Sequence, residues 1–478
     1  MSINLAQVLS VTLALIHALG IISALHAVNT VRTSQGTIAW VLSLITFPYL
    51  ALPLYWIFGR NRFYGYVEAL RQQQPEKAPP GQADLLQRQI QPFKATLPPA
   101  LDVEFAVLEK ISRLPYTTGN QLQLLINGSE TFSAIFKAID AAEHYILVQF
   151  FIIKNDYIGR ELRDRLIQKA QQGVKVCLLY DEIGSRTLPS NYLKPLNNNG
   201  VNTSAFDSTR GFYNRFQLNF RNHRKIVVVD GRVGFLGGLN VGDEYLGKGR
   251  LGYWRDTHLS VRGPMVQSLQ KVFASDWYWA TRQVLDFLEW MPAWAGEQTG
   301  MILPSGPADE LETCSMLFHQ TIVGAQQRLW IASPYFVPSL PVFDMLQLAA
   351  LRGVDVRILL PAQPDHTLVY LSSFSFLQAA DRAGVKIYRY QKGFLHQKVI
   401  LVDDDVAAVG TANLDNRSLR LNFEVMAVVA DRDFARQVRV MLEEDFSHSR
   451  QTSHADLEKR SWLFKWAVRA ARLFDPIL

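Results

Sequence analysis

A motif that occurs twice is the feature of this sequence that most constrains its fold. The first copy lies in residues 221–240 and the second in residues 394–413. Each copy reads His-x-Lys, four residues, Asp, six residues, Gly-x-x-Asn. The matched residues are His223, Lys225, Asp230, Gly237 and Asn240 in one copy, and His396, Lys398, Asp403, Gly410 and Asn413 in the other. A repeat of this kind predicts a duplicated fold with two equivalent half-sites.

Segments typical of strands and helices alternate around both copies. The strand-like segments are 121–128, 144–153, 174–185, 328–339 and 354–365, and the helix-like segments are 129–142, 159–173, 311–327 and 341–353. This alternation predicts an α/β fold with crossover helices. A chain of 478 residues is longer than a domain with a single hydrophobic core usually is. We therefore expect two similar domains, 119–295 and 296–452, related by a pseudo-twofold axis.

Two apolar segments at the N-terminus, 3–28 and 37–59, predict a membrane domain within residues 1–65. Pro48 and Pro53 should kink the second segment, which membrane helices tolerate. A signal peptide is the alternative for the first segment, but the segment lacks the basic n-region of a signal peptide and is followed by a second apolar segment. We expect His17 and His26 to face a neighbouring helix rather than to act chemically.

The charges around these segments predict the orientation of the chain. Arg32 lies between the two segments, whereas Arg60, Arg62 and Arg71 follow the second. The positive-inside rule then places the N-terminus and the remaining chain in the cytoplasm. Residues 66–118, rich in Gln and Pro, read as a linker with one short helix at most.

The C-terminal tail, residues 453–478, ends in a short basic amphipathic helix. Its apolar residues are Trp462, Leu463, Trp466 and Leu473, and its basic residues are Lys465, Arg469 and Arg472. Such a helix suits a membrane interface, and packing on the domain is the alternative.

The composition excludes few functions by itself. The net charge of +6 suits anionic lipid or nucleic acid equally. Cys177 and Cys314 lie in apolar segments and read as core residues of a protein in a reducing compartment. The sequence contains no CxxC or HExxH motif and no carboxylate cluster at metal-ligand spacing, so we expect neither a metal nor a cofactor.

The two motifs together suit the chemistry of a phosphodiester. Side chains two apart in a strand share a face, so each His lies beside its Lys. One imidazole could attack phosphorus while the other protonates the departing alkoxide. The two lysines would neutralise the phosphate oxygens, and Asn240 and Asn413 would donate further hydrogen bonds to them.

An attacking imidazole needs a carboxylate on its other nitrogen. Asp256 and Glu424 follow His223 and His396 by 33 and 28 residues on strand-like stretches. We therefore expect Asp256 to orient His223, and Glu424 to orient His396. Asp230 and Asp403 belong to the motif and so to the candidate catalytic set. Each ends an apolar strand before a turn, so we interpret both as structural.

At these residues the chain resembles the phospholipase D superfamily, over residues 119–450. The stretches NHRKIVVVDG, GGLNVGDEY, WRDTHLSVRGP, SPYFVPS and GTANLDNRSLRLNFE, and the N-terminal pair of spans ending YWIFGRNR, look like the bacterial cardiolipin synthases of that superfamily. The resemblance implies two α/β/α sandwich domains preceded by two transmembrane helices. Gly238 stands where the superfamily often has Ser, and Thr411 fills the matching position.

The resemblance also implies a reaction at an inner membrane, with the catalytic domains on the cytoplasmic side. His223 would take a phosphatidyl group from phosphatidylglycerol, and His396 would act as the acid. A second phosphatidylglycerol would accept the group, giving cardiolipin, and homo-oligomers are possible. Lys225, Lys398, Asn240 and Asn413 map to phosphate-binding positions.

Two alternatives of other kinds remain open at this point. A hydrolase, or a transphosphatidylase with another alcohol, would use the same site. A nuclease would instead need a long basic groove, so we expect no nucleic acid partner. A non-catalytic membrane scaffold would not need two complete motifs.

Overall fold

The computed structural model describes residues 5–31, 33–59, 62–72, 82–207, 209 and 219–478. The chain forms two compact units. The smaller unit contains Met1–Val67 and Asp207–Phe220, and the larger contains Glu68–Phe206 and Arg221–Leu478. Arg32 and Arg60, on which the orientation of the chain was partly predicted, lie outside the described residues.

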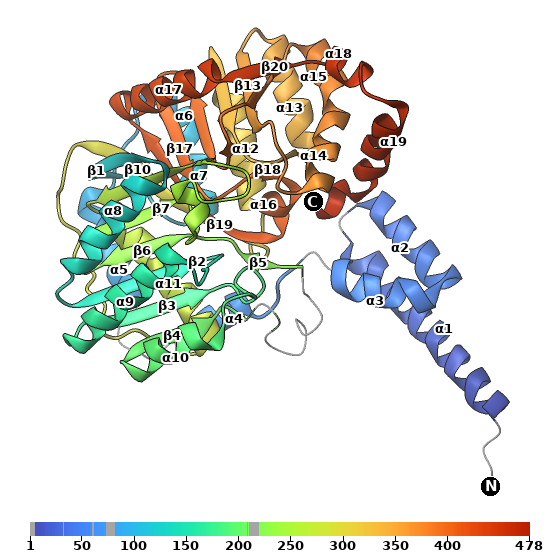
Figure 1. The fold of residues 1–478 in the computed structure, drawn as a ribbon, viewed down its shortest axis with the longest axis horizontal. Helices are drawn as coiled ribbons and strands as arrows, with labels where there is room; N and C mark the ends of the chain where they lie inside the picture. Colours follow the sequence, from blue (N-terminus) through green and yellow to red (C-terminus); the bar gives the residue numbers. More distant parts are fainter. Residues whose placement is uncertain (1–4, 32, 60–61, 73–81, 208, 210–218) are drawn as a thin grey trace. The chain divides into compact units, whose positions relative to one another are not determined.

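The smaller unit contains α1 (Leu5–Thr30), α2 (Ser34–Thr46) and α3 (Pro48–Phe58) (Figure 1). Among the described residues, α1 is the one helix that is long and apolar enough to cross a bilayer by itself. Small residues of α1 lie against its neighbours: Gly20, Ser23, Ala24 and Ala27 are buried. A Cβ on Gly20 would lie 2.5 Å from the Leu44 carbonyl oxygen, so only glycine permits this close approach.

The second apolar segment, 37–59, is interrupted at Pro48, as expected, and forms α2 and α3. The helix breaks at Phe47, whose φ of −133° and ψ of 58° are not helical. Pro48 causes the break, because its ring disfavours a helical conformation in the preceding residue and it has no N–H to donate. The expected role of His26 is confirmed, since its Nδ1 lies 2.6 Å from the Tyr55 hydroxyl of α3.

The larger unit contains two similar halves. The first half, residues 117–281, is a mixed sheet with the helices that cover it. Its strands are β1 (Thr117–Ile126), β2 (Tyr145–Phe150), β3 (Lys175–Tyr180), β4 (Val201–Ala205), β6 (Ile226–Val229), β7 (Val233–Gly237) and β9 (Thr257–Arg262). Its helices are α8 (Asn127–Asp140), α9 (Tyr157–Gln171), α10 (Ser190–Asn198) and α11 (Met265–Thr281). The strand order is β4-β3-β2-β6-β7-β9-β1.

Residues 298–447 repeat this arrangement and are called the second half. Its strands are β10 (Gln298–Ser305), β11 (Arg328–Ala332), β13 (Asp355–Pro361), β14 (Lys386–Tyr390), β16 (Val399–Val402), β17 (Val406–Gly410) and β19 (Asn422–Ala430). Its helices include α12 (Thr313–Gly324), α13 (Leu340–Leu351), α14 (Thr367–Ser373), α15 (Leu377–Ala383), α16 (Asn416–Arg420) and α17 (Arg432–Ser447). The order β14-β13-β11-β16-β17-β19-β10 matches the first half strand for strand, and β20 (Ser449–Thr452) extends its edge.

The two halves join edge to edge through β1 and β10, which pair antiparallel with Thr117 opposite Gly300. In each half several helices contact one another over the sheet, α8 to α10 in the first and α12, α13 and α15 in the second. A long helix, α11 or α17, packs separately on the strands of its half (Figure 1). Each half has its own buried apolar cluster, and the central strands β2, β6, β7, β16 and β17 are buried throughout. The predicted mixed α/β fold with two similar halves is confirmed.

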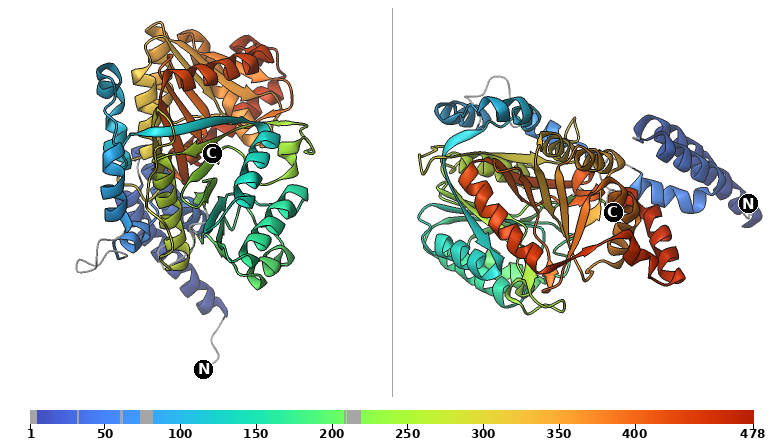
Figure 2. Two further views of the ribbon diagram at one scale, coloured as in Figure 1. Left: turned by 90° about the vertical axis from the view of Figure 1, so that its left-hand side faces the viewer. Right: turned by 90° about the horizontal axis from the view of Figure 1, so that it is seen from above.

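The segment expected to be a linker is largely helical, so that prediction is wrong for its described part. It contains α4 (Tyr66–Gln72), α5 (Gln82–Ile90), α6 (Pro99–Phe105) and α7 (Val107–Ser112). Figure 2 shows the blue helices of residues 82–112 running along one side of the larger unit. Phe105 and Leu108 enter the core of the second half. The linker was predicted from a composition rich in Gln and Pro, although a few apolar residues recur at helical spacing. Helices this short are stabilised mainly by tertiary packing.

Candidate active site

Two short parallel strand pairs bring the motif histidines to the opposite half of the larger unit. β5 (Arg221–Asn222) pairs with β19, and the His223 amide donates to the Phe423 carbonyl at 2.9 Å. In the same way β15 (Phe394–Leu395) pairs with β8 (Trp254–Arg255), and the His396 amide donates to the Arg255 carbonyl at 2.8 Å. Each histidine therefore lies beside the carboxylate-bearing strand of the other half.

His223 is paired with Glu424. Its Nδ1 lies 3.0 and 2.9 Å from the two carboxylate oxygens. Glu424 is fully buried and accepts hydrogen bonds from Thr411 at 2.5 Å and Ser418 at 2.8 Å. Burial would raise the pKa of Glu424, but the neighbouring His223 and Lys225 hold it below its usual value. The carboxylate thus stays ionised and fixes the orientation of the ring.

His396 is paired with Asp256, whose Oδ2 lies 2.7 Å from Nδ1. Asp256 is fully buried and also accepts from the Thr257 amide at 2.7 Å. The prediction that each carboxylate orients the histidine of its own half is therefore wrong, although both carboxylates are correct. The crossed pairs lie 201 and 140 residues apart in the sequence, against 33 and 28 residues for the pairs within one half, and sequence separation gives no signal for such a long-range exchange.

Both imidazoles are nearly inaccessible, and this sets their charge. Burial, opposed by Glu424 and reinforced by Lys225, lowers the pKa of His223 to about 4. Burial together with Lys398 lowers the pKa of His396 to about 4, against the opposing effect of Asp256. Both rings are therefore neutral near pH 7. With a carboxylate at Nδ1, the Nε2 lone pair of His223 is left for reaction, and His396 Nε2 lies 3.2 Å from Lys398 Nζ.

The motif lysines lie beside their histidines as predicted. Lys225 Nζ donates to the His223 carbonyl at 2.6 Å, and Lys398 Nζ donates to the His396 carbonyl. Burial lowers the pKa of Lys398 to about 8 and that of Lys225 well below its usual value, although nearby carboxylates oppose both shifts. Two desolvated ammonium groups at one centre favour an anionic ligand there.

The two motif asparagines are buried at the same centre. Asn240 accepts from the Ile152 amide at 3.1 Å and donates to the Tyr245 hydroxyl at 3.4 Å. That hydroxyl in turn lies 3.4 Å from His396 Nδ1. The Asn413 amide nitrogen donates to Asp415, and its side-chain oxygen is buried without a partner. Asn240 is therefore linked to His396 through Tyr245, whereas Asn413 keeps one side-chain oxygen without a hydrogen bond.

Asp230 and Asp403 lie at the far ends of the motif strands, where they hold backbone. Asp230 accepts from the amides of Glu143, His144 and Tyr145 at 2.7 to 2.8 Å. Asp403 accepts from the amides of residues 326–328 at 2.7 to 3.0 Å. Both have a φ of 52°, in the left-handed region that Asp tolerates in turns. Their contacts agree with the structural interpretation and not with an acid–base role.

The residues at the Gly238 position explain how carboxylates of different length serve the two histidines. A Cβ on Gly238 would lie 2.0 Å from an Asp256 oxygen, so the Asp256 carboxylate occupies the space of the missing side chain. In the other half, Thr411 fills that space and hydrogen-bonds the longer Glu424. The pairs Gly238–Asp256 and Thr411–Glu424 are therefore matched in size.

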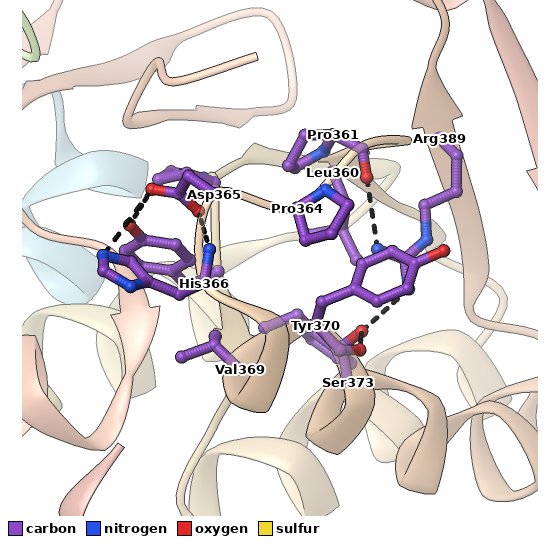
Figure 3. Close-up of a pocket in the computed structure, with 12 residues that line it drawn as sticks. Leu360, Pro361, Pro364, Asp365, His366, Val369, Tyr370, Ser373 and Arg389 are labelled. Carbon is purple, nitrogen blue, oxygen red and sulfur yellow. Dashed lines mark hydrogen bonds and ion pairs between the residues drawn. The ribbon is translucent and has the colours of Figure 1, made fainter. Parts of the chain in front are cut away.

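Several residues around the site were not predicted from the sequence. Aromatic rings flank both histidines: Phe151 lies 4.9 Å from His223, and Trp254 lies 5.1 Å from His396. A small pocket lies in the second half (Figure 3), with Asp365 and His366 at one end and Arg389 at the other. Tyr335, from the stretch SPYFVPS, donates to Asp365 at 2.6 Å. These aromatic and acidic residues do not recur at a fixed spacing in the two halves, so the sequence did not identify them as site residues.

The described residues contain no group of three or more His, Cys, Asp or Glu side chains placed to hold a metal ion. The expectation of metal-independent chemistry remains a prediction for experiment. Cys177 and Cys314 are both buried and unpaired, as expected.

Comparison with known proteins gives consistent matches over nearly the whole chain. The family model "Cardiolipin synthase, PLD-like domain" matches residues 135–277 and 318–446, and "Phospholipase_D-nuclease N-terminal" matches residues 18–60. Cardiolipin synthase A of Pseudomonas putida strain GB-1 is 50% identical, with 98% of each chain covered. Cardiolipin synthase A of Pseudomonas aeruginosa strain LESB58 is 49% identical, covering 97% of this chain and 95% of that one.

A solved structure supports the fold independently. The phosphatidylserine synthase of Haemophilus influenzae Rd KW20 matches with a TM-score of 0.60 and 16% identity, over 78% of this chain and 99% of that one.

Proposed function

The chain belongs to the family of cardiolipin synthases with phospholipase D-like domains, and from this premise we propose how it makes cardiolipin. The donor and the acceptor are both phosphatidylglycerol, and the enzyme is a phosphatidyltransferase of the phospholipase D superfamily. The observation that carries the mechanism is the crossed arrangement His223–Glu424 and His396–Asp256, in which a carboxylate of the opposite half holds each neutral imidazole at Nδ1.

In the first step, His223 Nε2 attacks the phosphorus of the donor. The P–O bond to the head-group glycerol breaks, and His396 donates a proton to the departing oxygen, so glycerol leaves. Free His396 is neutral with a pKa of about 4. A bound phosphodiester anion adds negative charge beside His396 and so favours its protonated form.

In the second step, His396 removes a proton from a hydroxyl of the second phosphatidylglycerol. The resulting alkoxide attacks the phosphohistidine, the P–N bond breaks, and cardiolipin leaves with His223 restored. Lys225, Lys398, Asn240 and Asn413 stabilise the phosphate oxygens in both steps. The assignment of His223 as nucleophile follows the resemblance, because the geometry of the two halves is nearly equivalent.

Trapping the intermediate tests the roles of the histidines. His396→Ala incubated with phosphatidyl p-nitrophenol labelled in its phosphate, a donor whose leaving group needs no acid, should retain label on His223, because the second step lacks its base. His223→Ala should retain none and form no cardiolipin. Label on residue 396 of the His223→Ala protein would reverse the assignment. Lys398→Ala should lower turnover by roughly 10² or more while leaving the fold intact.

Product analysis separates transfer from hydrolysis. With pure phosphatidylglycerol in vesicles we expect cardiolipin and glycerol, in the presence or absence of a metal chelator. Phosphatidic acid and glycerol as the main products would instead identify a hydrolase.

We further propose that the smaller unit is a multi-pass anchor in the inner membrane, with the larger unit on the cytoplasmic side. α1, with 26 residues, is about 39 Å long at 1.5 Å per residue, enough for a hydrocarbon core of about 30 Å. α2 and α3 are each too short, so they would cross together as a broken helix. A cysteine at the Gly36 position tests this topology in sealed vesicles. It should react with a membrane-impermeant reagent on the side opposite the larger unit, and not with reagent on the same side as the larger unit.

A further inference from the structure

The C-terminal tail presents a row of exposed apolar side chains, here called the tail face. It lies on α19 (Trp462–Ala471) and the following 3₁₀ turn (Arg472–Ile477). The tail face comprises Trp462, Leu463, Trp466, Leu473 and Phe474, whose exposed fractions are 68, 62, 60, 80 and 47%. Two exposed tryptophans one helical turn apart form an apolar surface that water solvates poorly.

The opposite side of the same helix is fixed to the second half. Val468 and Ala471 are buried there, and the Phe464 ring lies 5.3 Å from the Phe374 ring, edge to face. Both sequence interpretations of the tail are therefore partly correct, since one face packs on the domain and the other is exposed. The tail face is thus a rigid surface of the enzyme rather than a loose extension.

The charges around the tail face suit an anionic surface. Residues 458–478 contain five basic residues, Lys459, Arg460, Lys465, Arg469 and Arg472, and two acidic ones, Asp475 and Glu458, of which Glu458 pairs with Lys465 at 2.9 Å. Asp475 points inward, where Ser372 donates to it. Arg469 lies 5.5 Å from the Trp466 ring, so a cation and an indole share one edge of the face. Tryptophan beside Lys and Arg is the combination found at membrane interfaces with anionic lipids.

The supports of the tail connect it to the candidate active site. The Asn416 side chain donates to the Asp475 carbonyl at 2.9 Å, and the Arg417 amide donates to the Leu478 carbonyl at 3.0 Å. Both residues belong to α16, which begins three positions after Asn413. α19 also packs on α14, whose Val369 and Tyr370 line the pocket in Figure 3 (Figure 1).

We propose that the tail face docks on an anionic lipid bilayer and so presents the active site to lipid head groups. A substrate with two acyl chains leaves a bilayer only at high cost, so its phosphate must reach His223 at the membrane surface. A second contact, distinct from the N-terminal helices, fixes the orientation of the larger unit. The proposal rests on the proposed function only in taking phosphatidylglycerol as the substrate.

The test compares two forms of substrate with the full chain. The variant Trp462→Ser/Leu463→Ser/Trp466→Ser should be about tenfold or more slower on phosphatidylglycerol vesicles, because interfacial binding scales with buried apolar area. It should stay within about twofold of the unaltered protein on monomeric dihexanoyl phosphatidylglycerol, which needs no docking. The control Leu348→Ser/Leu351→Ser removes exposed apolar residues of α13 in the same half, and should change neither rate.

A second measurement reports contact with the bilayer independently of catalysis. A fluorophore on Leu463→Cys should be quenched by brominated phosphatidylglycerol in the vesicles, whereas one on Leu351→Cys should not. Unchanged vesicle turnover, equal loss on both substrates, or the absence of quenching at position 463 would each overturn the proposal. A full chain that makes no cardiolipin from either substrate contradicts the proposed function instead, and the quenching result still decides docking.

Discussion

At the scale of single residues, each reactive histidine depends on a carboxylate from the other half of the protein. Glu424 holds His223 and Asp256 holds His396, each at Nδ1. The roles of the two histidines in the proposed reaction differ, so the crossing has consequences that kinetics can measure. The loss of Glu424 should affect attack on phosphorus, and the loss of Asp256 should affect proton transfer.

A donor with a good leaving group distinguishes the two pairing schemes. Phosphatidyl p-nitrophenol needs no acid to release p-nitrophenol, so Asp256→Asn should keep a rapid burst of product. Glu424→Gln should slow the burst by roughly 10² or more, because His223 loses its orienting partner. Stopped-flow absorbance measures the burst. The reverse pattern would indicate that each carboxylate serves its own half.

Gly238 gives a second prediction at this scale. Gly238→Ala should displace the Asp256 carboxylate, whose oxygen lies 2.0 Å from the new Cβ, and lower cardiolipin synthesis by roughly 10². Since the burst with the p-nitrophenol donor does not use His396, it should persist in this variant. Loss of both activities would point to general damage to the fold instead.

At the scale of elements, buried ion pairs hold the strands that carry the site. Arg255 on β8 makes two hydrogen bonds to Asp445 on α17, at 2.7 and 2.9 Å. Arg224, between the first motif His and Lys, makes the corresponding bond to Asp276 on α11 at 2.7 Å. Because Arg255 belongs to the first half and Asp445 to the second, this pair also fixes the halves to each other.

Removing one partner of such a pair should be strongly destabilising. Asp445→Ala leaves the buried Arg255 charge without its partner and should lower the free energy of unfolding by about 3 to 5 kcal/mol. The matched control is Asp433→Ala on the same helix, whose pairing with Arg436 is largely exposed, with an expected change of about 0.5 kcal/mol or less. Thermal unfolding in detergent measures both. Equal effects would show that the Arg255–Asp445 pair contributes little.

At the scale of the whole molecule, burial of three histidines makes stability depend on pH. Burial lowers the pKa values of His223 and His396 to about 4 and that of His258 to about 3. An unfolded histidine titrates near 6.5. As the pH falls below 6.5, the unfolded chain therefore binds protons that the folded chain does not, and stability decreases. Burial raises the pKa of Asp181 to about 7, which has the opposite sign but involves one group.

The melting temperature should accordingly fall between pH 7 and pH 5. His258 is well suited to test this, because both of its ring nitrogens are buried without partners. His258→Leu removes one titrating group, so the fall in melting temperature should be smaller than in the unaltered protein. A steeper fall in the variant would contradict the assigned sign.

The composition of the site and the general fold could be predicted from the amino-acid sequence alone. The spacing of the duplicated motif identified both His–Lys pairs, because a strand places alternate side chains on one face whatever surrounds it. Alternating apolar segments predicted the α/β halves, since the burial of a strand or helix face depends on local pattern. The turn role of Asp230 and Asp403 was also readable, because it depends on immediate neighbours.

Contacts between residues far apart in the sequence, by contrast, depend on how the two halves pack. Asp256 and Glu424 exchange histidines because β5 and β15 each pair with a strand of the opposite half, a contact that sequence separation does not encode. Helices α6 and α7 pack on the second half, which offers an apolar surface to Phe105 and Leu108. The tail shows the same principle, since packing of Val468 and Ala471 determines which of its residues remain exposed. Local pattern thus fixed the strands and helices of the two halves, and long-range packing fixed their partners and the helices before the first half.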